Sequence, residues 1–133
     1  MRTSTYFIAS LIVAAIMVLS CTSAPIVIDD TLTPMELVQR AQDATDKNQY
    51  SAAMQYYQAI LDRYPKDIDM VCAAEYEIAF LYYKQKKYTP AKERFRALLQ
   101  RYEAPDADFL PLQYKILAEK VLAKIELDGL SKH

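Results

Sequence analysis

The residue types that most often perform catalysis or hold a metal ion are scarce in this chain. Its 133 residues include one histidine, His133, and one glycine, which leaves no basis for imidazole chemistry or a glycine-rich phosphate-binding loop. Glu75 and Glu77 lie two positions apart, so on a helix they point to different faces and cannot act as a carboxylate pair. Asp67 and Asp69 flank a turn but lack the further ligands of a calcium site. We therefore expect a protein that is not an enzyme and that holds no cofactor or metal ion.

The charges are balanced overall but unevenly distributed. Sixteen Lys and Arg residues against 17 Asp and Glu residues give a net charge of −1, which argues against a nucleic-acid-binding protein. Between Lys84 and Arg101, however, Glu93 is the single acidic residue among seven basic ones. Such a sector is either an ordinary solvated helix face or a surface for anionic head groups, an acidic protein or peptidoglycan carboxylates.

The N-terminal residues have the character of a targeting signal. The apolar run 6–19 is as long as the core of a signal peptide and short for a membrane span of about 20 residues. It ends at Val18-Leu19-Ser20-Cys21, which resembles the lipobox of bacterial lipoproteins. The resemblance implies cleavage before Cys21 and acylation of its thiol and amino group. An uncleaved anchor helix, or ordinary signal-peptide cleavage elsewhere, is the alternative.

This interpretation divides the chain into a signal peptide (1–20), a lipidated tether (21–32) and a helical domain (33–130). Two or three acyl chains hold a protein stably at a bilayer, whereas one holds it marginally. Because no Asp follows Cys21, the lipoprotein resemblance implies a bacterial envelope protein in the outer membrane, facing the periplasm. Cys72 would then have no intramolecular partner, and we expect it to be a small buried apolar residue.

Start and stop signals predict five helices with short loops. Thr33-Pro34 with Glu36 is a capping box with proline at the first helical position, and it predicts a helix over 34–47. Further helices are expected over 50–63, 69–86, 90–102 and 110–127. The second of the five ends where Pro65 forces the preceding residue out of the helical region, and the last ends at Gly129.

Two of the expected hairpins share one pattern. Tyr50-x-x-Ala53-x-x-x-Tyr57 corresponds to Tyr88-x-x-Ala91-x-x-x-Phe95, 38 residues later. This resembles the tetratricopeptide repeat (TPR), in which small residues lie where two helices cross and aromatic residues pack one hairpin on the next. We assign this packing role to the following residues: Ala41, Ala53, Tyr57, Ala79, Tyr82, Ala91 and Phe95. An ordinary antiparallel bundle with periodic apolar faces is the alternative.

The expected fold is therefore all-α: a short TPR-like superhelix of two hairpins plus a C-terminal capping helix, after an N-terminal signal helix. In the TPR class the first helices of the hairpins line a concave surface that binds partners. Carrying these positions onto this chain predicts the following groove residues: Gln42, Thr45, Tyr76, Phe80, Tyr83, Lys84, Lys115 and Glu119. The aromatic residues with Lys84 would suit a peptide with an acidic or C-terminal group. Alternatively, Phe80 and one of the tyrosines pack against the last helix.

A lipobox combined with tandem hairpins is similar to the BamD-type lipoproteins of the outer-membrane β-barrel assembly machinery and to the cell-division coordinator of the Tol–Pal system. The shared motifs are Tyr64-Pro65, Ala73-Ala74, Ala79-Phe80-x-Tyr82 and Tyr88-x-x-Ala91. The resemblance implies a membrane-anchored adaptor that binds another envelope protein or peptide. A periplasmic small-ligand carrier and a self-associating structural spacer, hence a homo-oligomer, are the alternatives.

Overall fold

The computed structural model describes residues 24–130, and in this part of the chain five α-helices and one 3₁₀ helix are the regular elements. They are α2 (Pro34–Asp46), α3 (Tyr50–Arg63), α4 (Ile68–Lys84), α5 (Tyr88–Arg101), η1 (Ala107–Phe109) and α6 (Leu112–Leu130). The predicted all-helical fold is confirmed, and the helix ends lie within three residues of those expected. The expected signal helix and Cys21 lie outside the described residues. Within 24–130, no helix is long and apolar enough to cross a bilayer.

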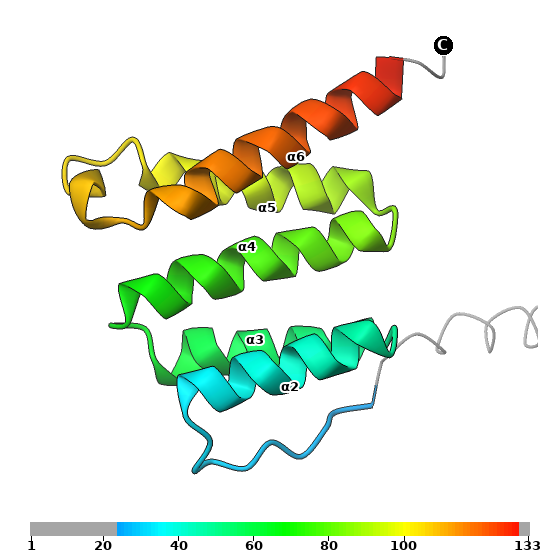
Figure 1. Ribbon diagram of the computed structural model, residues 1–133, viewed down its shortest axis with the longest axis vertical. Coiled ribbons are helices and arrows are strands. Elements are labelled where there is room, and N and C mark those ends of the chain that lie inside the picture. Colours follow the sequence, from blue (N-terminus) through cyan, green and yellow to red (C-terminus); the bar gives the residue numbers. More distant parts are fainter. Residues whose placement is uncertain (1–23, 131–133) are drawn as a thin grey trace, which may run out of the picture.

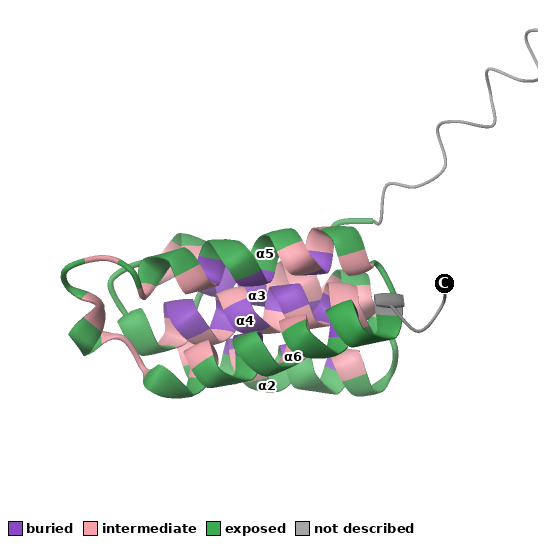
Figure 2. Cartoon of the chain, turned by 90° about the horizontal axis from the view of Figure 1, so that it is seen from above, coloured by how far each residue is buried: buried purple, intermediate pink, exposed green. Residues whose placement is uncertain are grey.

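The helices form two hairpins and a final helix. α2 pairs with α3 and α4 pairs with α5, while α3 also packs on α4 and α5 on α6. Figure 1 shows the resulting stack, with α2 and α3 at one end, α4 in the middle, and α5 and α6 at the other end. Seen from above in Figure 2, α2 and α6 lie on one side of the stack and α5 lies on the other.

Two apolar clusters hold the stack together. The first lies between α2, α3 and α4, and its fully buried side chains include Leu37, Ile60 and Ile78. The second lies between α4, α5 and α6 and includes Phe95 and Leu98. Because α4 contributes buried residues to both clusters, it is the central helix of the fold (Figure 2).

The two hairpin turns have the same geometry. Asn48 and Lys86 occupy equivalent places, with positive φ angles of 57° and 59°. After each of them the chain closes the preceding helix: the N–H of Gln49 donates to the carbonyl of Ala44 at 2.8 Å, and that of Lys87 to the carbonyl of Tyr82 at 3.0 Å. A residue in the left-handed region ends a helix in this way, which is why α4 stops at Lys84 rather than at the expected residue 86.

Two predicted boundary signals act differently in the structure. The helix expected from residue 90 begins earlier, at Tyr88, and Pro90 lies in its first turn, where an N–H has no intrahelical partner. α6 continues through Gly129 to Leu130. Glycine inside a helix costs about 1 kcal/mol, so it permits a helix that it does not favour.

The segment expected to be a free tether is partly folded onto the domain. Residues 24–32 run along α2 and α3 as irregular chain (Figure 1), and the side chain of Leu32 is buried in the first cluster. Arg63 donates hydrogen bonds to the carbonyls of Asp29 at 2.9 Å and Ile28 at 3.3 Å, and Gln55 accepts one from the N–H of Ile26 at 2.9 Å. These side chains satisfy the backbone of the segment, so the tether predicted over 21–32 does not include 24–32.

Candidate functional site

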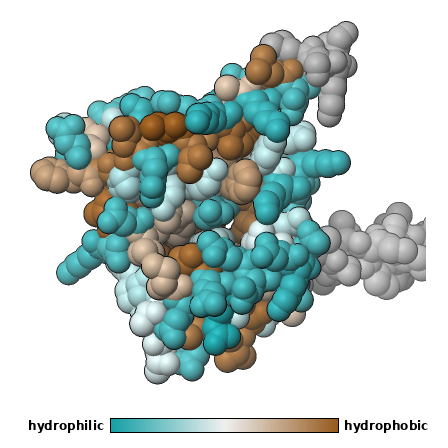
Figure 3. Space-filling view, in the orientation of Figure 1, coloured by the Kyte–Doolittle hydropathy of each residue, from teal (hydrophilic) through white to brown (hydrophobic). Residues whose placement is uncertain are grey.

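The concave face of the stack is formed by α2, α4 and α6. On α4, Ala74 and Ile78 belong to the first cluster, and Cys72 and Ala79 to the second. At 100° per residue, the side of α4 that lies between these two packed sides carries Ala73, Glu77, Phe80 and Lys84. Figure 3 shows this face of the molecule hollowed across its middle, over α4.

A ladder of aromatic rings borders this floor. The ring of Phe80 stacks between Tyr76 and Tyr83, with centroid distances of 5.8 Å and 5.6 Å. The ammonium group of Lys84 lies 5.7 Å from the centroid of Phe80. Such a cation–π contact holds a lysine in place while leaving its N–H groups available to an acceptor. The arrangement offers a partner flat apolar surface beside a fixed positive charge.

The rings differ in how far they can take part in binding. Tyr76 is 7% exposed, and it also contacts Phe95 at 5.6 Å and Tyr114 at 5.9 Å. Burial raises the pKa of Tyr76 to about 12. It is therefore part of the packing between α4, α5 and α6, whereas Phe80 and Tyr83 are half-buried and Lys84 is exposed.

Glu77, rejected above as part of a carboxylate pair, is a feature of this face that was not among the predicted groove residues. It is half-buried on the floor, one helical turn before Phe80 and two turns before Lys84. Burial raises the pKa of its carboxyl group, and the charge of Lys84 opposes this shift. The expected groove therefore contains a partly desolvated carboxylate as well as a lysine. Glu77 lies seven residues, or two helical turns, before the predicted groove residue Lys84, and this spacing could have placed Glu77 on the same face.

The remaining predicted groove residues are divided between faces. Gln42 is exposed and Thr45 is half-buried on α2, where the hydroxyl of Thr45 donates to the carbonyl of Ala41 at 2.8 Å. On α6, Tyr114 contacts α4, and Lys115 and Glu119 are turned by about 100° and 140° from it around the helix. Lys115 and Glu119 therefore lie on a different side of α6 from the residue that contacts α4.

The residues assigned to repeat packing lie in the interior. Four alanines at the helix crossings are fully buried: Ala41, Ala53, Ala79 and Ala91. Tyr57 and Phe95 are also buried, one in each cluster, and burial raises the pKa of the Tyr57 hydroxyl. Tyr82 is half-buried and contacts both clusters. Cys72 is buried with a free thiol whose pKa is raised by burial.

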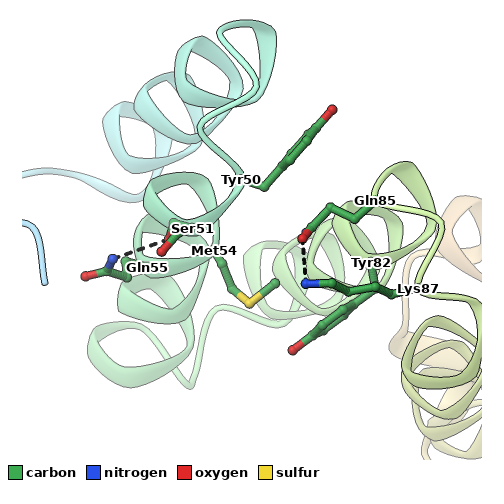
Figure 4. A pocket seen from close by; sticks show the side chains of 7 residues that line it. All are labelled: Tyr50, Ser51, Met54, Gln55, Tyr82, Gln85 and Lys87. Carbon is green, nitrogen blue, oxygen red and sulfur yellow. Dashed lines mark hydrogen bonds between the residues drawn. The ribbon is translucent and has the colours of Figure 1, made fainter. Parts of the chain in front are cut away.

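The convex side carries a cavity of about 330 Å³ between the two hairpins, drawn in Figure 4. Tyr50, Met54 and Gln55 line it from α3, and Tyr82, Gln85 and Lys87 from the end of the second hairpin's first helix and its turn. Lys87 donates to Gln85 at 2.9 Å across its rim. Its lining contains no carboxylate, and residues 24–130 contain no group of three or more His, Cys, Asp or Glu that could hold a metal ion.

Comparisons with known proteins agree with the repeat register. A family model described as "Tetratricopeptide repeat" matches residues 37–67 and 73–103. A protein of Treponema pallidum (strain Nichols), named "Uncharacterized protein", is 35% identical over 109 residues, or 80% of this chain. This chain spans 44% of that relative's length. No solved structure matches the chain significantly.

The two matched segments coincide with the two hairpins: the first runs from within α2 to the end of the α3–α4 turn, and the second from within α4 to two residues after α5. Tetratricopeptide repeats are generally non-enzymatic scaffolds for protein–protein interaction. Two tandem segments of the chain therefore match the tetratricopeptide repeat, each over one helical hairpin, and one further helix follows them.

Proposed function

We propose that this protein is a membrane-anchored adaptor of the bacterial cell envelope that holds a segment of another envelope protein on its concave face. The observation that supports it most directly is the half-buried pair Phe80 and Tyr83 beside the exposed, ring-supported Lys84. Aromatic residues flanked by a fixed charge are typical of residues that dominate binding energy at protein interfaces.

The face suits a peptide segment with an apolar side chain followed by a carboxylate. The apolar side chain would rest on Phe80 and Tyr83, and the carboxylate would pair with Lys84. Glu77 disfavours an acidic group placed deeper in the hollow, because two carboxylates there would repel each other. The position of the acidic group on the partner is therefore restricted to the Lys84 end of the floor.

Crosslinking in intact cells, followed by mass spectrometry, identifies the bound protein, and binding is then measured with purified variants. We expect Tyr83→Ala and Lys84→Glu each to weaken binding about tenfold or more, since central interface residues carry most of the energy. Tyr56→Ala, a half-buried tyrosine of α3, and Lys66→Glu, an exposed lysine of the opposite end, are the matched controls. Equal binding by the two groove variants and their controls would remove the groove from the mechanism.

The anchoring part of the proposal rests on Val18-Leu19-Ser20-Cys21. Mass spectrometry of the protein extracted from membranes should show acyl groups on an N-terminal Cys21. Cys21→Ser should abolish the acyl mass and release the protein from the membrane fraction. A protein that stays membrane-bound without acyl mass would instead favour an uncleaved anchor helix.

A self-associating spacer is a second candidate, favoured by the outer face of α6. Leu112, Ile116 and Leu127 are 61%, 43% and 66% exposed, and they lie on the side of α6 away from Ala118. Sedimentation of the extracted protein over a range of concentrations tests this candidate. We expect Ile116→Lys to lower any self-association, while Lys66→Glu, at an exposed position in the α3–α4 turn, serves as a control.

A further inference from the structure

Residues 24–32, which pack along α2 and α3, determine which ends of the helices lie next to Cys21. Ala24 lines a surface cavity together with Asn48, Gln49 and Gln85, so the chain enters the domain between the two hairpin turns. Figure 1 shows both turns, and the start of the described chain, at the same end of the helices. Two residues separate Ala24 from Cys21, and an extended chain spans at most ~3.3–3.6 Å per residue. Cys21 therefore lies within about 11 Å of Ala24.

That end of the molecule is basic. We call it the turn end and define it as residues 45–50 and 83–88. It contains four exposed lysines, Lys47, Lys84, Lys86 and Lys87, and Asp46 as its acidic residue. Its half-buried tyrosines are Tyr50, Tyr83 and Tyr88, a residue type enriched where membrane meets water.

The other charged groups near this end lie on three neighbouring helices. Arg40 and Asp43 of α2 line a surface cavity with Lys47, and Lys92 and Glu93 lie on α5 one turn after Tyr88. The last turns of α6 add Lys124, Glu126 and Asp128, and Glu126 pairs with Arg96 of α5 at 3.5 Å. The turn end therefore keeps a positive balance when the neighbouring helices are included.

The opposite end of the helices, away from the two hairpin turns, is acidic. It is formed by residues 29–30, 62–69 and 101–108, which contain eight carboxylates and three basic side chains. Arg63 is committed to Asp30 at 2.8 Å, and Arg101 to Glu75 at 2.6 Å. An anionic surface would thus attract one end of the molecule and repel the other.

We propose that the turn end lies against an anionic phospholipid surface, so that the helix axes stand roughly perpendicular to the bilayer and the acidic end points away from it. This rests on the acylation of Cys21 given under the proposed function, and it adds an orientation. The short connection brings the lysines to the head groups, and the concave face is then presented perpendicular to the membrane. Each lysine near an anionic surface strengthens attraction about fivefold.

The absence of tryptophan from the sequence allows a direct test, because one introduced Trp reports its own surroundings. Acylated protein carrying Gln49→Trp (turn end) or Pro105→Trp (acidic end) is placed in vesicles that contain brominated phosphatidylcholine, with or without phosphatidylglycerol. We expect the bromine to quench the fluorescence of Gln49→Trp but not of Pro105→Trp, and to do so more strongly with phosphatidylglycerol.

Charge reversal supplies the matched comparison. Adding Lys86→Glu and Lys87→Glu removes two lysines and adds two repelled carboxylates, so it should weaken the attraction of the turn end to the membrane by about 30-fold or more and bring the quenching of Gln49→Trp close to that of Pro105→Trp. Lys66→Glu at the acidic end should leave it unchanged. Equal quenching of the two probes in protein that carries the acyl mass would overturn the orientation alone. Absence of the acyl mass would overturn the anchoring proposal and the orientation with it. Unchanged quenching, with loss of a bound acidic protein on charge reversal, would show that the turn end binds protein rather than lipid.

Discussion

The close approach of α4 and α5 can be tested by enlarging one buried alanine. Ala79 on α4 and Ala91 on α5 are both 0% exposed and belong to the same cluster. Replacing Ala79 by Leu adds three carbon atoms at the crossing. If the space existed, burying them would stabilise the fold by about 2 kcal/mol, at ~0.8 kcal/mol per methylene. If the helices touch, the added atoms must push them apart, which typically costs about 1–3 kcal/mol.

The two cases differ in sign, so the measurement is decisive. We expect Ala79→Leu to lower the free energy of unfolding by about 1–3 kcal/mol. For a domain of this size that corresponds to a fall in melting temperature of roughly 5–20 °C. Thermal and urea denaturation followed by circular dichroism measure both quantities. Ala97→Leu, at an exposed position of α5, is the matched control and should change the melting temperature little. Equal or greater stability of Ala79→Leu would refute the reasoning about small residues at the crossings.

Three further predictions concern single groups. Burial raises the pKa of Glu77 in the folded state, so ionisation of Glu77 lowers the stability of the fold as pH rises from the unfolded pKa through the folded pKa. Glu77→Gln should therefore raise the free energy of unfolding at pH 7, and this gain should vanish in acid. The exposed control Glu119→Gln should show no such gain. Thr33→Ala removes a complete capping box and should cost about 0.5–2 kcal/mol by thermal denaturation; an unchanged melting temperature would contradict this. The raised pKa and burial of Cys72 predict that its thiol reacts with iodoacetamide far more slowly in native protein than in urea; equal rates would show that the second cluster opens readily.

The helices and their repeat register follow from local chemistry, and for that reason the sequence revealed them. The capping box at Thr33 forms as expected, with the N–H of Thr33 donating to Glu36 at 2.8 Å. The alanines at the crossings are recognisable because their 38-residue repeat is periodic. The capping signal depends on residues within one turn, and the repeat is found by comparing the sequence with itself, so neither requires knowledge of distant contacts.

The features that the sequence did not reveal depend on distant partners. The packing of residues 24–32 relies on side chains about thirty positions away, such as Tyr64, whose hydroxyl donates to the carbonyl of Leu32 at 2.7 Å. The burial of Tyr76 depends on Phe95 and Tyr114, which lie on two other helices. The phase of α6 could not be predicted either, because apolar residues occur on more than one of its sides, including Leu112 and Ile116.

The division of the interior into two apolar clusters has a consequence for how the molecule loosens. The clusters meet at the half-buried ring of Tyr82 and share α4, so the outer helices on one side of α4 can detach while the cluster on its other side stays packed. Linear arrays of this kind lose structure from their ends, because an end unit has a neighbour on one side alone. The backbone amides of α6 should accordingly exchange with deuterium first and those of α4 last, which would make the central helix the last part of the protein to give up its protons.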